Sequence, residues 1–320
     1  LVAEATAAAD NNMETVGAIN FDRGSRIQLA TETTGDAFLT AASITRATAG
    51  VGAGTGHGTM VFLPTITGTG AVLNFGGAAV AASSQQQLYF TAAPITSATS
   101  AVPNMLPGYF MDGSSHRFAK IGANGITPVV DGDMVAMPTG AGTGAEVVNI
   151  TATTTMGSFE TSIYALRGGA FTLNSPTGAN NDATVILGGS GADVGSVASF
   201  GSFTINPNLQ FGATGTNEGI FYTGSTLTVN GNITAGSITK FGTGGTLVIT
   251  NDQSDAARGI GNGYQGGWVV NEGALQFGQF GSAGNAVATN TIVLNGATAG
   301  SAQLNLRAQP ADTLLNYTYT

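Results

Sequence analysis

The sequence predicts an all-β protein and, within that class, a parallel β-helix, or β-solenoid. Composition is the first observation behind this prediction. Of 320 residues, 49 are glycine and only 8% are charged, whereas 42% are hydrophobic. Helices that face water are built largely from Glu, Lys and Arg, and each glycine inside a helix costs about 1 kcal/mol relative to alanine. The chain is therefore poor in helix formers but has enough apolar residues to fill a core.

Recurring apolar runs of strand length are the second observation. Gly, Asn, Ser and Asp separate one run from the next, as expected for short strands joined by turns. In chain order the runs are 18–21, 60–63, 72–75, 88–90, 147–150, 162–166, 171–173, 184–187, 203–205, 227–229, 247–249, 268–270, 291–294 and 304–306.

The spacing of these runs is the third observation. From residue 184 onward the strongest runs follow one another at intervals of about 19 to 24 residues, the length expected of one coil of a solenoid. In such a fold the coils stack through parallel strands in register, apolar side chains fill the interior, and Gly supplies the corners. An antiparallel sandwich or jelly roll also has short strands and Gly-rich turns, and it is the alternative.

The first 108 residues follow the strand pattern less closely than the rest. Stretches of small residues at 47–59 and 76–84 interrupt it, and the segment 103–108 resembles a turn. We therefore expect a β-rich N-terminal region over 1–108, made of early coils or a cap, and a solenoid over 109–320. A cap is useful there because a terminal coil exposes strand edges.

Charge and cysteine content exclude several functions. The net charge is −9, and clustered Lys and Arg for binding nucleic acid are missing. No stretch reaches 18 consecutive apolar residues, so we expect no membrane-spanning helix. The absence of cysteine excludes disulfides, thiolate metal sites and a cysteine nucleophile. Low charge, no cysteine and abundant Gly, Thr and Asn are typical of exported bacterial proteins, so we expect a secreted, extracellular or cell-surface location.

Two segments in the C-terminal half form an informative pair. Residues 240–251 read Lys-Phe-Gly-Thr-Gly-Gly-Thr-Leu-Val-Ile-Thr-Asn, and residues 263–277 read Gly-Tyr-Gln-Gly-Gly-Trp-Val-Val-Asn-Glu-Gly-Ala-Leu-Gln-Phe. Together they resemble the autotransporter-associated β-strand repeat, whose pattern runs Lys-x-Gly-x-Gly-x-Leu-x-Leu, then Asn and Tyr-x-Gly, then Val-x-x-Gly-x-Leu. The chain departs from that pattern in the extra glycine at 244–245 and in the longer connection 252–262.

The resemblance spans about residues 240–278 and implies the right-handed β-helix of an autotransporter passenger, displayed on or released from the bacterial outer surface. A fold does not by itself fix a function. The residues themselves predict that alternate apolar positions fill the interior, that glycines mark the corners, and that Lys240 lies along the surface. The expected interior positions are Leu247, Ile249, Val269, Leu275 and Phe277, and the expected corners are Gly242, Gly244, Gly266 and Gly273.

Catalytic groups are scarce. The chain has two histidines and no Gly-x-Ser-x-Gly pentapeptide, which argues against a serine hydrolase. Asp131 and Asp133 are the closest pair of acids, but a glycine between two aspartates equally marks an exposed turn. Glycan-cleaving sites also need basic and aromatic residues around the acids, and the chain has nine Lys and Arg and one Trp. We therefore expect no enzymatic activity and assign no catalytic residue.

Calcium is the one cofactor that the sequence suggests, as a structural ion. Residues 188–193, Gly-Gly-Ser-Gly-Ala-Asp, copy the start of the calcium-binding nonapeptide, yet Gly195 stands where a large apolar residue belongs and no tandem copy follows. The calcium candidates are Asp193, Asp131 and Asp133. Residues 261–266 match a dinucleotide glycine pattern, but a strand follows them in place of a helix, so no phosphate site is expected.

These observations favour a structural protein. We expect an extracellular β-solenoid that self-associates into a filament, fibre or surface layer, because only 8% of its residues are charged and solenoid ends carry unpaired strands. The alternative is a surface adhesin whose loops, such as 91–108 and 251–267, bind a glycan or a cell-surface protein. A secreted polysaccharide-degrading enzyme ranks third.

Overall fold

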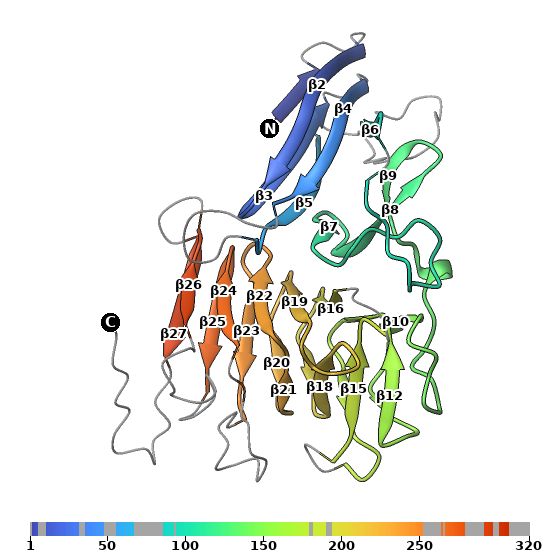
Figure 1. Cartoon of the computed structure of the whole chain (residues 1–320), viewed down its shortest axis with the longest axis vertical. Coiled ribbons are helices and arrows are strands. Elements are labelled where there is room, and N and C mark those ends of the chain that lie inside the picture. The colour runs from blue at the N-terminus through green and yellow to red at the C-terminus, as the bar shows by residue number, and fades with distance from the viewer. Residues whose placement is uncertain are drawn as a thin grey trace. The chain divides into compact units, whose positions relative to one another are not determined.

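A computed structural model describes most of the chain and is all-β. The described residues are 2–5, 11–31, 36–47, 56–66, 86–92, 94–178, 182–189, 194–251, 264, 266–278, 291–296 and 301–306. Among them the one helical element is a 3-10 turn, η1 (Asp131–Asp133). The chain forms two compact units, Leu1–Met134 and Val135–Thr320 (Figure 1). The boundary expected after residue 108 falls inside the first unit, because β7 (Phe110–Asp112) pairs with β5 (Thr59–Ile66).

The first unit contains two sheets between which the chain alternates. One sheet has the order β1-β3-β5-β7-β8-β9 and the other β2-β4-β6. The pairs are parallel except for β7 with β8 and β8 with β9. The remaining strands are β1 (Val2–Ala5), β2 (Asn11–Phe21), β3 (Gly24–Thr31), β4 (Asp36–Arg46), β6 (Gln86–Phe90), β8 (Arg117–Gly122) and β9 (Gly125–Pro128).

The core of the first unit follows from alternation along its strands. In β4, Ala37, Leu39 and Ala41 are buried and the residues between them are partly exposed. Aromatic side chains add to this core, with the rings of Phe62 and Phe110 stacked at a centroid distance of 5.9 Å.

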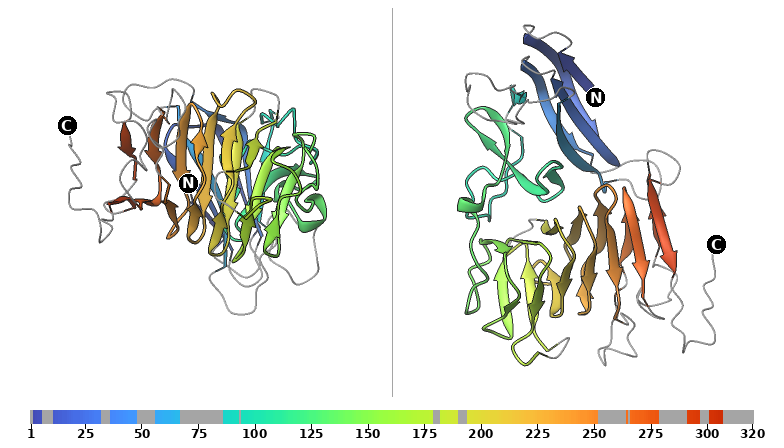
Figure 2. Two further views of the ribbon diagram at one scale, coloured as in Figure 1. Left: turned by 90° about the horizontal axis from the view of Figure 1, so that it is seen from below. Right: turned by 180° about the vertical axis from the view of Figure 1, so that it is seen from behind.

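In the second unit the chain passes through three parallel sheets in a fixed order, once per circuit, as far as β21 (Figures 1 and 2). Sheet I contains β10 (Val147–Ile150), β13 (Ala165–Gly168), β16 (Gly195–Ser199), β19 (Glu218–Thr223), β22 (Ser237–Phe241), β24 (Gly267–Val270) and β26 (Ile292–Leu294). Sheet II contains β11 (Thr154–Thr155), β14 (Thr172–Asn174), β17 (Phe203–Ile205), β20 (Leu227–Val229), β23 (Thr246–Ile249), β25 (Gly273–Phe277) and β27 (Ala302–Leu306). Sheet III contains β12 (Glu160–Ile163), β15 (Thr184–Leu187), β18 (Asn208–Phe211) and β21 (Ile233–Thr234).

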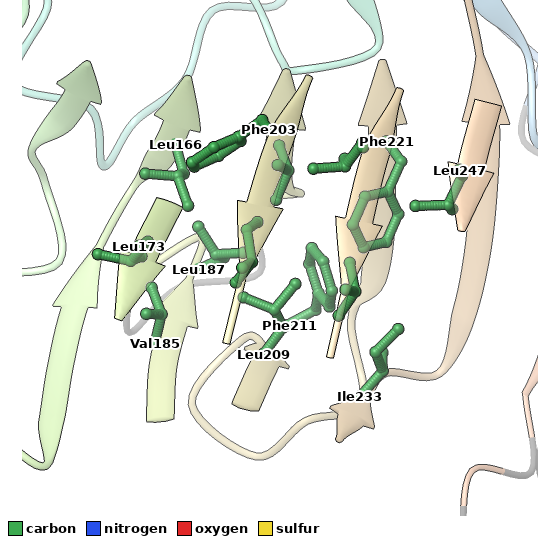
Figure 3. Close-up of a cluster of buried hydrophobic side chains, with 14 of the residues drawn as sticks. Leu166, Leu173, Val185, Leu187, Phe203, Leu209, Phe211, Phe221, Ile233 and Leu247 are labelled. Carbon is green, nitrogen blue, oxygen red and sulfur yellow. The ribbon is translucent and has the colours of Figure 1, made fainter. Parts of the chain in front are cut away.

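A continuous apolar core runs through the second unit. Figure 3 shows side chains from all three sheets pointing into the same space, among them Leu166, Leu187 and Phe203. Each of these three is fully buried. Parallel register stacks equivalent positions of successive circuits, so Leu166 lies beside Val197 in sheet I. The core is therefore filled by rows of apolar side chains that run across the strands.

Rows of polar side chains mark one corner of this unit. Asn206 Nδ2 donates to Asn174 Oδ1 at 2.8 Å, Asn230 Nδ2 to Asn206 Oδ1 at 2.7 Å, and Thr250 Oγ1 to Asn230 Oδ1 at 2.5 Å. Successive members lie 32, 24 and 20 residues apart in sequence. We call this row the asparagine ladder. It shows that the circuits differ in length while their corners stay in register.

Most expected runs are strands, with differences that have physical reasons. The run 162–166 covers the end of β12 and the start of β13, with Tyr164 between the two strands. The strands that are not among the expected runs are β1, β3, β4, β7, β8, β9, β11, β16, β18, β19, β21, β22 and β25. In β16 all five residues are buried, so small polar side chains on a covered face hide the alternation. The run 72–75 lies outside the described residues.

One interior assignment was wrong. Leu247, Ile249, Leu275 and Phe277 are fully buried in the core, as expected. Val269, in contrast, faces the other side of β24, while its neighbours Trp268 and Val270 belong to the core.

Candidate functional site

Lys240 occupies an inward-facing position of sheet I. In the register of the sheet it lies between Phe221 and Val270, and both of these side chains belong to the apolar core. Its exposed fraction is 0%. The expectation that Lys240 lies along the surface is therefore wrong. A charged group can be buried at this position only if hydrogen bonds replace its hydration.

Backbone carbonyls supply those hydrogen bonds. Lys240 Nζ donates to the carbonyl oxygens of Gly242 at 3.2 Å, Gly245 at 2.9 Å and Glu272 at 2.5 Å. An ammonium group has three N–H donors, so three acceptors satisfy it completely. The bonds join the turn after β22 to the turn before β25. We call this arrangement the Lys240 cradle.

Two of the motif glycines are needed to build the cradle. Gly273 has a φ of +76°, and a Cβ there would lie 2.0 Å from Lys240 Nζ. A Cβ on Gly245 would lie 2.1 Å from the carbonyl oxygen of Thr223, the last residue of β19. The lysine and these glycines of the repeat-like segment therefore form one structure, in which the glycines leave space for the ammonium group and the backbone.

The cradle changes the acidity of the lysine. Burial lowers the pKa of Lys240 from 10.5 to about 7, and the nearby charge of Glu272 opposes this shift. The Glu272 carboxylate accepts a hydrogen bond from Thr243 Oγ1 at 2.9 Å. Because Lys240 is fully buried and its donors are all used, the cradle braces two turns and offers no free amine to a ligand.

Asp131 and Asp133 lie together in η1, each beside a basic residue of β8. Asp131 Oδ2 is 2.8 Å from Arg117 Nη2, and Asp133 Oδ2 is 2.5 Å from Lys120 Nζ. The backbone N–H of Val130 also donates to Asp133 Oδ2. These contacts stabilise a turn, and each pairs one carboxylate oxygen with a basic side chain of β8.

The remaining calcium candidate, Asp193, lies outside the described residues. In the part of the chain that the structure describes, no group of three or more His, Cys, Asp or Glu side chains could hold a metal ion. Phe159 is the one exposed aromatic side chain of the described residues, with an exposed fraction of 59%. Of the two loops expected to carry recognition, 91–108 is described except for residue 93, whereas most of 251–267 is not.

The two ends of the parallel sheets in the second unit differ. At the β10 end, residues 135–144 run across the first circuit. Val135 bonds to Val147 and Asn149, while Ala141 and Gly144 both bond to Ser162. This segment, the β10 cap, covers strand edges that would otherwise be open. At the other end Leu294 of β26 continues the inward-facing row of Val270 yet is 49% exposed.

Comparisons with protein-family models, with curated proteins and with solved structures find no match to this chain. Among the described residues, no helix is long and apolar enough to cross a membrane.

The cradle was missed by sequence reasoning although a signal for it exists. Ile238 and Lys240 stand at alternate positions of one strand and therefore share a face. A lysine on the apolar face of a strand, followed by glycines two and five residues later, indicates an ammonium group directed at turn carbonyls.

Proposed function

We propose that this chain is a non-enzymatic, extracellular structural protein. In this proposal it is a right-handed β-solenoid, related to autotransporter passengers, that self-associates into a filament, fibre or cell-surface layer. The observation that carries the proposal is the passage of the chain through three parallel sheets in a fixed order around one apolar core. That path is the one expected when each coil contributes one strand to each face.

Two further observations support a structural role. The candidate acids Asp131 and Asp133 are both engaged by basic side chains of β8. The repeat-like segment contains Lys240, whose ammonium group donates three hydrogen bonds to backbone carbonyls inside the protein. Both features serve the stability of a scaffold. No cofactor is part of the proposal.

Electron microscopy of the native protein over a range of concentrations tests the proposal. We expect regular filaments or sheets whose abundance rises with concentration. Isolated particles at every concentration would contradict self-association and favour the adhesin alternative, for which a glycan array is the next measurement. Release of reducing ends from a broad panel of glycans would instead favour an enzyme.

A further inference from the structure

The outer edge of β2 is the longest free strand edge among the described residues. β2 has 11 residues and pairs with β4 on one side, and no described strand pairs with its other side. Its side chains face water along most of its length. Met13 is 75% exposed, and Glu14, Thr15 and Ala18 are exposed as well.

This edge lacks the features that usually prevent strand pairing. Natural edges are short, bulged, or carry lysine or proline. β2 contains neither lysine nor proline, and Glu14 is its one charged residue. Its register with β4 keeps one spacing from the Asn11–Asp36 pair to the Phe21–Arg46 pair, so the strand has no bulge. Among the described strands, none pairs with the backbone groups along this straight edge.

Strand length indicates what pairs with this edge. Among the described strands only β2 and β4 have 11 residues, and β4 already has a neighbour on both sides. The strands at the other sheet edges of the described chain have two to five residues. Of the described strands, β2 of a second copy is therefore the one whose length satisfies the whole edge.

We propose that two copies of this chain associate by antiparallel pairing of their β2 strands. A two-fold axis through Val16 gives complete overlap of Asn11–Phe21 and uses the same surface on both copies. It places Met13 opposite the second copy's Ile19, and Glu14 opposite the second copy's Ala18. Parallel pairing in register would instead set Glu14 against Glu14, which is unfavourable. This inference rests on the proposed self-association and names one of its contacts. Because a two-fold contact closes on itself, a filament or layer would grow through a second contact between such dimers.

Adding a like charge across this contact, and then restoring opposite charges, tests the inference. Ala18→Glu puts a carboxylate opposite Glu14 twice per dimer, and we expect the dissociation constant to rise on the order of tenfold. The double variant Glu14→Lys with Ala18→Glu restores opposite charges and should return the constant to the wild-type value or below. Ala152→Glu, at an exposed alanine of the second unit, is the matched control and should leave the dissociation constant unchanged. Sedimentation velocity over a concentration series measures all four proteins.

The outcomes separate this contact from the proposed function. If the wild type associates but Ala18→Glu behaves like Ala152→Glu, or the double variant fails to recover, the β2 contact is wrong and self-association stands. If the wild type stays monomeric at every concentration and forms no filaments, both ideas fail. Weaker association of Ala18→Glu, together with wild-type association of the double variant, supports pairing through β2. A second charge change would not repair a folding defect.

Discussion

At the scale of single residues, the Lys240 cradle explains why one glycine in each of the two joined turns should respond differently to substitution. Gly273 and Gly244 have nearly the same φ, +76° and +74°, but a Cβ on Gly273 meets Lys240 Nζ and a Cβ on Gly244 meets nothing within 4 Å. Gly244→Ala should cost about 1 kcal/mol of unfolding free energy through its backbone conformation alone. Gly273→Ala should cost roughly 2 kcal/mol more, because it also displaces the ammonium group and leaves buried carbonyls unpaired. Denaturant unfolding measures both, and equal losses would contradict the cradle.

The same lysine predicts a pH dependence of stability. Its pKa is about 7 in the folded protein, below its ordinary value of 10.5, so between these pH values the unfolded chain binds more protons. Stability of the wild type should therefore rise from pH 7 toward pH 10 relative to Lys240→Met, by up to about 1.4 kcal/mol per pH unit. Lys120→Met, which removes a partly exposed ion pair with Asp133, is the control and should track the wild type within about 1 kcal/mol. A difference between wild type and Lys240→Met that stays constant with pH would contradict the shift.

At the scale of strands, alternation identifies the inward face only where the other face is polar. The run 247–249 is found within β23, where Leu247 and Ile249 face the core and Val248 is partly exposed. Sheet I has buried residues on both faces, so β24 reads as a continuous Trp-Val-Val run and the inward pair could not be chosen from sequence. The intervals of 19 to 24 residues are comparable to the length of one circuit. The runs that they separate, however, do not all belong to one sheet.

The asparagine ladder makes a prediction at the same scale. Asn206 sits in the middle of the row and bonds to both Asn174 and Asn230, whereas Asn251 donates one amide bond to Asn232 in a separate pair. Asn206→Ala should lower the unfolding free energy by about 1–2 kcal/mol, and Asn251→Ala by about 0.5–1 kcal/mol. Thermal unfolding of the two variants checks the order. A smaller loss for Asn206→Ala would mean that the ladder adds little to the stability of the corner.

At the scale of the whole molecule, composition predicted the class of fold but not the boundary between its two compact units. Low charge and abundant glycine led to an all-β chain, which is what the structure has. The boundary lies between Met134 and Val135 and not after residue 108. Within residues 109–134, β7 pairs with β5, and β8 and β9 extend the same sheet from β7. Pairing with a strand that is distant in sequence leaves no local signal in composition.

Two compact units with separate strand networks predict two unfolding transitions. Leu39 is buried in the first unit, and Lys240 is buried in the second. Leu39→Ala should lower one transition temperature by removing about 2–5 kcal/mol from its unit, while the other stays in place. Lys240→Met should move only the second transition, because its hydrogen bonds lie within Val135–Thr320. Differential scanning calorimetry separates these cases, and a single transition that both substitutions shift equally would show that the units unfold as one.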